Sequence, residues 1–181
     1  MWIEKDFEEK MTQYIDNIYK DIFGNRLIKI YRSSRNNKED EKLLFMDIEL
    51  SIDTHLTFNN GSVLTFQEKT LRNCNAKYNA FTFEYYNNPK IKEEGEWFKL
   101  AAQLYFFGYA NKFENGYEKF WILNVAKLRT KLMSTYNIND MEKQFLRHNK
   151  PPSKANFFAI PFEILENLKD IIIYKNYKRG S

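Results

Sequence analysis

The chain has 181 residues, with 28 Lys and Arg against 24 Asp and Glu, and its formal net charge is +4. This length suits one domain with a substantial core, and the 43% of hydrophobic residues excludes a largely disordered chain. The single cysteine, Cys74, excludes an intramolecular disulfide and a multi-cysteine metal site, so we expect a cytoplasmic protein. No apolar run reaches the roughly 18 residues of a membrane span, and the start MWIEKDFEEK is too acidic for a secretory leader, so no membrane contact is expected.

The first half of the chain predicts a helix followed by strands. Apolar residues recur every three or four positions from Ile3 to Phe23, which indicates an amphipathic helix that Gly24 ends. A short strand is expected at 27–31, and the polar tract SSRNNKEDEK at 33–42 is typical of an exposed loop. Residues 43–57 predict a strand with one apolar and one acidic face, because polar residues alternate with Met46, Ile48, Leu50 and Ile52.

A turn and a returning strand complete a predicted hairpin. Asn59, Asn60 and Gly61 tolerate the positive φ angles of a tight turn, and 63–71 is the returning strand. With the turn centred on Asn60, paired residue numbers sum to about 120, so Leu56 faces Leu64.

The remaining elements give a mixed order of helices and strands. We expect a strand at 81–86, a loop at 87–94, an apolar helix at 95–110, a strand at 120–125, a basic helix at 126–136, a strand at 156–160 and a helix at about 162–169. This order predicts an α/β or α+β domain with a mixed central sheet flanked by helices. We expect a single domain over 1–181, with a core at about 1–125 and a C-terminal strand and helices at 126–178.

The predicted hairpin brings chemically useful groups together. Its register sets Asp53 opposite Gln67 and Ser51 opposite Lys69 on the polar face, about 5 Å apart. Asp53, the Gln67 side-chain oxygen and the Glu68 backbone carbonyl could hold Mg²⁺ or Mn²⁺, which prefer oxygen ligands. Lys69 could activate a water or balance charge on a phosphorane, which indicates phosphodiester hydrolysis. The alternative interpretation is an ordinary polar face of an antiparallel hairpin.

Asp53, thirteen intervening residues and then Gln67-Glu68-Lys69 resemble the motif of the PD-(D/E)xK nuclease superfamily, which includes restriction endonucleases, Holliday junction resolvases and phage-type exonucleases. The resemblance implies a restriction-endonuclease-like core, with a leading helix, a hairpin that carries the motif and a helix packed behind it. Two positions depart from the pattern. Gln67 stands where most members have an acid, and Ile52 stands where proline commonly precedes the aspartate.

The resemblance also implies further site residues. Many members supply another acid from the leading helix, for which Glu8 is our choice and Glu4 the alternative, although both could simply solvate the helix border. Gln103 and Tyr105 are candidates for a position near the scissile phosphate, against the simpler interpretation that aromatic residues here form core. His55, on the polar strand face, could assist or be an ordinary surface histidine.

Basic residues in three places are candidates for binding the phosphate backbone of DNA. Arg72 directly follows the motif strand. The others lie on the basic helix and around Pro151-Pro152, where a solvated surface is the alternative explanation; they are Lys127, Arg129 and Lys131, and Arg147, His148, Lys150 and Lys154.

The sequence therefore predicts a Mg²⁺-dependent DNA endonuclease or junction resolvase, and by analogy a homodimer. The alternatives are a catalytically weak or inactive nuclease-fold module that binds DNA, and a phage-encoded factor that binds another protein. The sequence contains no GxxxxGK[ST], GxSxG or HExxH motif, and its two histidines make zinc catalysis an unfavoured interpretation.

Overall fold

A six-stranded mixed sheet forms the centre of the computed structural model, which describes residues 2–33, 41–149 and 153–176, with backbone alone for 2–5. Only β3 and β6 run parallel to each other; the other neighbours in this sheet are antiparallel. In spatial order its strands are β1 (Leu27–Arg32), β2 (Thr54–Phe58), β3 (Val63–Leu71), β6 (Leu104–Ala110), β7 (Tyr117–Asn124) and β10 (Ile172–Lys175).

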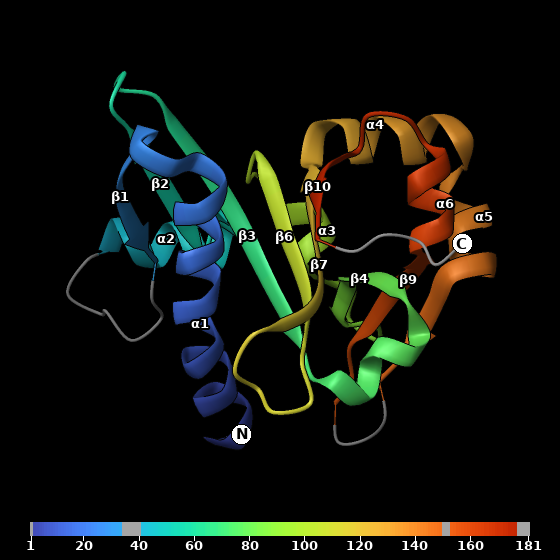
Figure 1. Cartoon of the computed structure of the whole chain (residues 1–181). Coiled ribbons are helices and arrows are strands. Elements are labelled where there is room, and N and C mark those ends of the chain that lie inside the picture. Colours follow the sequence, from blue (N-terminus) through green and yellow to red (C-terminus); the bar gives the residue numbers. More distant parts are fainter. Residues whose placement is uncertain (1, 34–40, 150–152, 177–181) are drawn as a thin grey trace.

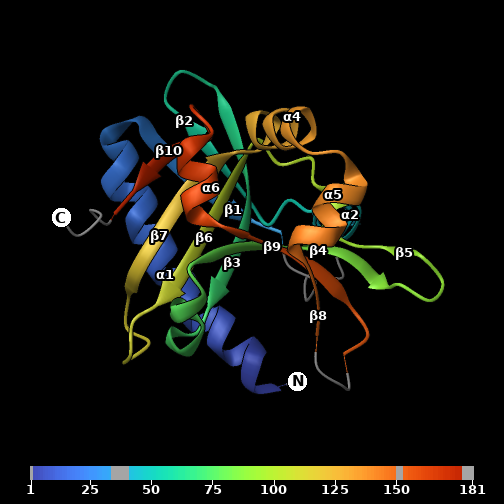
Figure 2. The same ribbon diagram turned by 90° about the vertical axis from the view of Figure 1, so that its right-hand side faces the viewer.

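A second, four-stranded sheet packs on one face of the first, together with most of the shorter helices (Figure 2). Its spatial order is β5 (Glu93–Glu94), β4 (Ala80–Asn88), β9 (Asn156–Pro161) and β8 (Leu146–His148). The helices of the second half are α3 (Glu96–Lys99), α4 (Val125–Thr135), α5 (Ile138–Phe145) and α6 (Phe162–Asn167), and two short 3₁₀ helices are η1 (Gly24–Arg26) and η2 (Asn73–Tyr78).

The long helix α1 (Trp2–Phe23) covers the opposite face of the six-stranded sheet (Figure 1). Its side chains buried against the sheet repeat every four residues, at Phe7, Met11, Ile15 and Tyr19. Tyr19 packs on Phe66 of β3, with 4.6 Å between the ring centroids. Because both faces of the sheet are covered, all seven residues of β6 are buried. The chain is thus an α+β protein with a mixed sheet flanked by helices.

Several predictions of elements are confirmed. Leu56 pairs with Leu64 and Thr54 with Phe66, which is the predicted hairpin register, and β3 has the predicted bounds. The predicted leading helix, the short strand after it and the elements near 81–86, 120–125, 126–136, 156–160 and 162–169 are also present, with small shifts of their ends. Most of the predicted loop at 33–42 lies outside the described residues.

The strand predicted at 43–57 is wrong in its first half, which forms helix α2 (Glu41–Leu50). Leu43, Met46 and Leu50 also follow the spacing of three and four residues that suits a helix, and Met46 and Leu50 pack against the core. The chain then turns at Ser51, whose φ is 47°, and the strand begins at Thr54. Ser51 therefore does not lie opposite Lys69 in the sheet.

The helix predicted at 95–110 is also wrong. Only Glu96–Lys99 is helical, and Leu104–Ala110 forms β6. A continuous apolar run is typical of a strand buried on both faces, and periodicity alone does not separate it from a buried helix. No helix of the described residues is long and apolar enough to span a membrane.

Candidate active site

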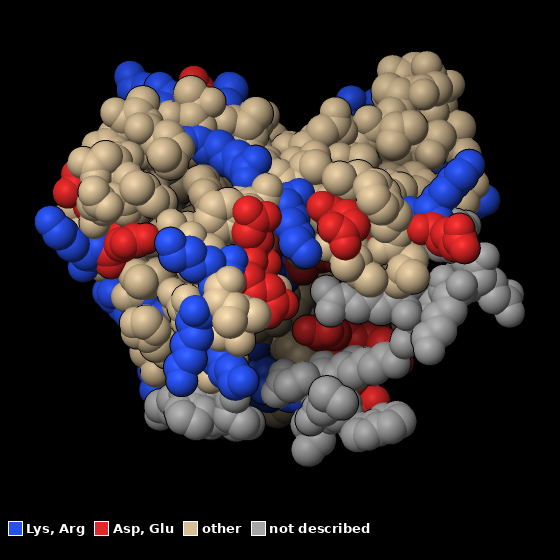
Figure 3. Space-filling view, turned by 180° about the vertical axis from the view of Figure 1, so that it is seen from behind, with Lys and Arg blue, Asp and Glu red and all other residues tan. Residues whose placement is uncertain are grey.

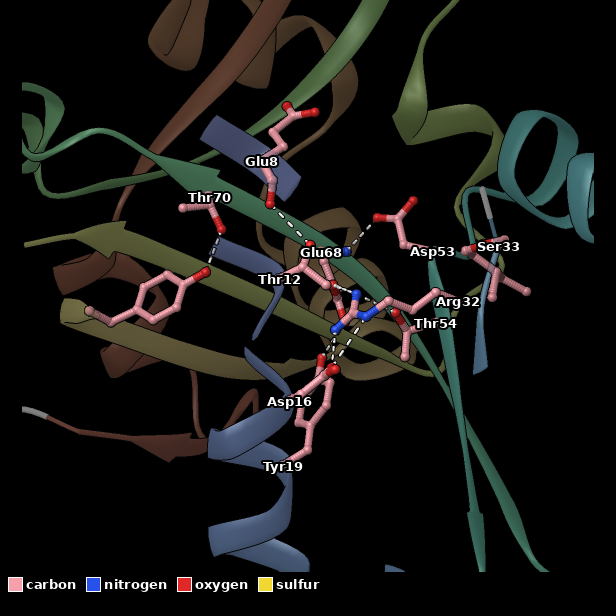
Figure 4. A network of polar contacts seen from close by, with 12 residues as sticks. Glu8, Thr12, Asp16, Tyr19, Arg32, Ser33, Asp53, Thr54, Glu68 and Thr70 are labelled. Atoms are coloured by element: carbon pink, nitrogen blue, oxygen red, sulfur yellow. Dashed lines mark hydrogen bonds and ion pairs between the residues drawn. The ribbon is translucent and has the colours of Figure 1, made fainter. Parts of the chain in front are cut away.

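The main chain of β3 holds the Asp53 carboxylate in place just before β2 begins. The Asp53 N–H donates to the Phe66 carbonyl at 2.9 Å. The Glu68 N–H donates to Asp53 Oδ2 at 2.8 Å, as drawn in Figure 4. Both contacts tie Asp53 to β3, so the carboxylate lies directly beside the Gln67–Lys69 segment.

Asp53, Gln67 and Lys69 share the face of the sheet that is opposite α1. Phe66 and Glu68 contact Tyr19 of α1, so the alternation of side chains sends Gln67 and Lys69 to the other face. The Gln67 Oε1 atom is buried and accepts no hydrogen bond from any described residue. A buried amide oxygen without a donor costs free energy unless another group satisfies it.

Glu96, the first residue of α3, joins this group and was not anticipated from the sequence. Its side chain is only 10% exposed. Its carboxylate accepts a hydrogen bond from the Tyr105 hydroxyl at 2.5 Å, and its Oε2 atom lies 3.9 Å from Lys69 Nζ. Tyr105 is the β6 partner of Gln67 in the sheet, which links the two sides of the group. The sequence signal was weak, because Glu96 is separated from Lys69 by a long segment that contributes two strands to the second sheet.

Burial and neighbouring negative charges disfavour the ionised form of the two carboxylates in the site. Burial raises the pKa of Asp53 well above its usual value, and the neighbouring carboxylates of Glu68, Asp47 and Glu96 raise it further. Burial also raises the pKa of Glu96, although Lys69 and the Tyr105 hydroxyl act in the opposite direction. A cation bound near both acids would remove these penalties, because opposite charge favours the ionised form.

A hard divalent cation fits the donor atoms that are present. Among the described residues, no three His, Cys, Asp or Glu side chains lie together as a metal-binding group. The oxygen donors on this face include two carboxylates and one amide, from Asp53, Glu96 and Gln67, and the Asp47 carboxylate lies near enough to raise the pKa of Asp53. Mg²⁺ is commonly bound through one or two carboxylates while it keeps several waters, so this set suits it. The unsatisfied Gln67 oxygen gives independent support for that fit.

The Glu68 side chain points to the α1 side, where it belongs to a network around Arg32 (Figure 4). Its carboxylate accepts hydrogen bonds from the Tyr19 hydroxyl at 2.9 Å and from Arg32 at 2.5 Å. Arg32 also contacts Asp16 at 2.5 Å and the Thr54 hydroxyl at 3.0 Å. The middle residue of the motif therefore anchors β3 with its side chain and reaches the site with its main chain.

Other candidates from the sequence lie outside this group or are occupied. Glu8 is exposed on α1, the helix that covers the other face of the sheet, and the Glu4 side chain is not among those described. Gln103 precedes β6, and its side-chain oxygen accepts a hydrogen bond from the Thr65 N–H at 3.0 Å. His55 shares the face of Asp53 but stacks on Tyr31.

The predicted phosphate-binding residues fall into two groups. Arg72 forms an ion pair with Glu114 and lies 4.1 Å from the centroid of the Phe7 ring. Arg129 donates a hydrogen bond to the Trp97 carbonyl, and its guanidinium lies over the Trp97 ring. These two arginines thus make structural contacts. Four other cations are exposed, namely Lys127, Lys131, Arg147 and Lys154, whereas Lys150 lies outside the described residues.

The surface opposite α1 is hollowed near its centre (Figure 3). Acidic side chains are visible within and beside the hollow, and Lys and Arg side chains lie near them on the part of its edge that described residues form. An acidic centre bordered by cations suits a site in which a metal ion offsets the acids while basic groups contact an anionic ligand.

Comparisons with protein-family models, with curated proteins and with solved structures found no match to this chain.

Proposed function

We propose that the protein is a Mg²⁺-dependent or Mn²⁺-dependent DNA endonuclease or junction resolvase with a restriction-endonuclease-like core. The observation that carries the proposal is the shared face of Asp53, Gln67 and Lys69, with the buried Gln67 oxygen lacking a donor among the described residues. Glu96 supplies the second carboxylate that the neutral Gln67 does not.

The order of elements supports the same proposal. A leading helix precedes a hairpin with Asp53 directly before its first strand, β2, and the Gln67-Glu68-Lys69 motif on its second strand, β3. Behind that hairpin, residues 72–103 form η2, β4, β5 and α3 before the chain returns as β6, parallel to β3. This insertion takes the place of the single packed helix that the resemblance implies, and it brings Glu96 to the site.

The residues of the chain have distinct roles in the proposed hydrolysis. Asp53, Gln67 and Glu96 would hold the divalent cation, which when bound supplies positive charge for the phosphate oxygens and a more acidic water. Lys69 positions the attacking water and balances the negative charge that develops on phosphorus as the new P–O bond forms and the old one breaks. The Glu68 N–H and the Tyr105 hydroxyl fix the two carboxylates, so little reorganisation is needed during the reaction.

The test is cleavage of supercoiled, linear and branched DNA with Mg²⁺ or Mn²⁺. Lys69→Ala should reduce cleavage by at least about a hundredfold, in the range of a lost electrostatic or acid–base group, while the folded structure persists. Lys20→Ala, which removes an exposed lysine from α1, is the control and should cut like the wild type. Absence of cleavage on every substrate, or equal activity of Lys69→Ala, refutes the proposal.

A second candidate is a nuclease-fold module that binds DNA without cutting it. The neutral Gln67 and the absence of a three-acid group among the described residues favour this candidate. It predicts DNA binding that needs no divalent metal and that is unchanged in Asp53→Asn. The nuclease proposal predicts instead that cleavage disappears in this variant.

A further inference from the structure

An exposed ring pair lies on the same face of the sheet as the candidate active site. Tyr31 of β1 stacks on His55 of β2, with 4.8 Å between centroids and 18° between ring planes. The Lys29 ammonium lies 4.0 Å from the centroid of the Tyr31 ring. Tyr31 is 38% exposed, so part of its ring is open to solvent.

The ring pair is continuous with the site. His55 follows Asp53 by two residues, so both point to the same face and lie about 7 Å apart along the chain. Tyr31 is the direct β1 partner of His55.

Several features of this surface suit a nucleobase next to a phosphate. An aromatic face can stack on any of the four bases, and a lysine beside it can contact the phosphate. A cation–π contact at an exposed site is weaker than base–aromatic stacking, so an incoming base can displace Lys29 from the ring. The His55 Nδ1 atom is buried with no hydrogen-bond partner among the described residues.

The bases of an intact duplex are stacked on each other and present no free face to such a surface. We propose that Tyr31, His55 and Lys29 bind an unpaired segment of DNA and guide it to the Asp53 site. The substrate class is therefore DNA with a single-stranded region, such as a flap, fork or junction. This inference rests on the proposed function for the reaction, but its binding step can be measured separately.

The binding test uses a labelled oligothymidylate of about a dozen nucleotides, a length within the usual range for one single-strand site. Fluorescence anisotropy without divalent metal gives Kd in the absence of cleavage. Tyr31→Ala should weaken binding by about 5-fold to 100-fold, and Tyr31→Phe should stay near the wild type because it keeps the ring. Binding of a blunt duplex should be the same in all three proteins.

Tyr78 provides a matched control. It is 67% exposed, and Lys77 lies 5.2 Å from its ring centroid, so it repeats the lysine–tyrosine pair on another segment. Tyr78→Ala should leave the Kd for oligothymidylate unchanged. An oligomer with abasic sites should bind wild type and Tyr31→Ala with similar Kd values, because the base that stacks is missing.

The outcomes separate this inference from the nuclease proposal. Cleavage by the wild type together with an unchanged Kd in Tyr31→Ala overturns the ring-pair inference and leaves the nuclease proposal standing. A weakened Kd in Tyr31→Ala, with no cleavage by the wild type under any condition, supports single-strand binding and refutes the nuclease. Tight binding of oligouridylate without binding of oligothymidylate overturns the assignment to DNA.

Discussion

Replacement of Arg32 by methionine should destabilise the fold strongly, because Arg32 is the charge partner of a buried carboxylate. The Glu68 side chain is 8% exposed and Arg32 is 24% exposed. Burial alone would lower the pKa of Arg32, but the Glu68 carboxylate and the hydrogen bonds to Glu68 and Asp16 raise it above its usual value. Methionine keeps much of the apolar stem and removes the charge.

The expected magnitude follows from the exposure of Glu68. Removal of one partner from a buried ion pair costs about 3–5 kcal/mol, since the remaining charge stays buried. For 181 residues, 1 kcal/mol shifts Tm by roughly 2.6 °C, so Tm should fall by about 8–13 °C. Urea unfolding followed by circular dichroism measures the change in free energy of unfolding, and calorimetry measures Tm.

Two further variants make the result specific to this ion pair. Arg26→Met changes an exposed arginine in η1 and should alter the free energy of unfolding by less than about 0.5 kcal/mol. The double variant Arg32→Met with Glu68→Met should regain part of the lost stability, since both charges are gone but the buried Tyr19 hydroxyl loses its acceptor. If Arg32→Met costs no more than Arg26→Met, the network around Glu68 does not stabilise β3 and the reasoning fails.

The remaining predictions concern the site. Burial raises the pKa values of Asp53 and Glu96 above the value of about 4 that they have in the unfolded chain, so the folded protein binds more protons. Stability from the protonated acids is present below pH of about 4 and is lost as pH rises through the folded pKa values; Mg²⁺ should restore it at neutral pH. The free energy of unfolding in urea, measured at several pH values, should therefore fall less with rising pH in Asp53→Asn than in the wild type. An equal dependence of this free energy on pH in the two proteins would contradict this account. Gly95→Ala should cost about 1–3 kcal/mol, because its Cβ would lie 2.9 Å from the backbone of Glu84 and Tyr85; a variant as stable as wild type in the same assay would show that α3 can move away from β4.

The hairpin was predictable because two independent signals agreed. The turn residues Asn59 to Gly61 and the apolar pairing of Leu56 with Leu64 specify one register, and β2 and β3 adopt it. This register is sufficient to place Asp53 beside Gln67. The part of the site that depends on the hairpin alone was therefore accessible from the sequence.

The rest of the site depends on contacts that local patterns do not encode. The apolar residues of 43–50 fit a strand or a helix, and packing of Met46 and Leu50 against the core decides for the helix. The strand Leu104–Ala110 is buried on both of its faces, because α1 covers one face of the six-stranded sheet and the second sheet covers the other. Its sequence therefore lacks the alternation of polar and apolar residues that marks a half-exposed strand. Glu96 reaches Lys69 only because residues 72–103 form a separate layer before the chain returns as β6.

The end of the β2–β3 pairing explains why the site lies at Asp53. The ladder ends with Thr54 opposite Phe66, while β3 continues to Leu71. Beyond that point the Glu68 N–H has no partner in β2, and the Asp53 carboxylate accepts its hydrogen bond instead. A short acceptor side chain is needed at this position, so Asp53 has a structural role as well as a proposed catalytic one. Asparagine keeps an oxygen for the Glu68 N–H and removes the charge, and for that reason Asp53→Asn separates the two roles whereas alanine would remove both.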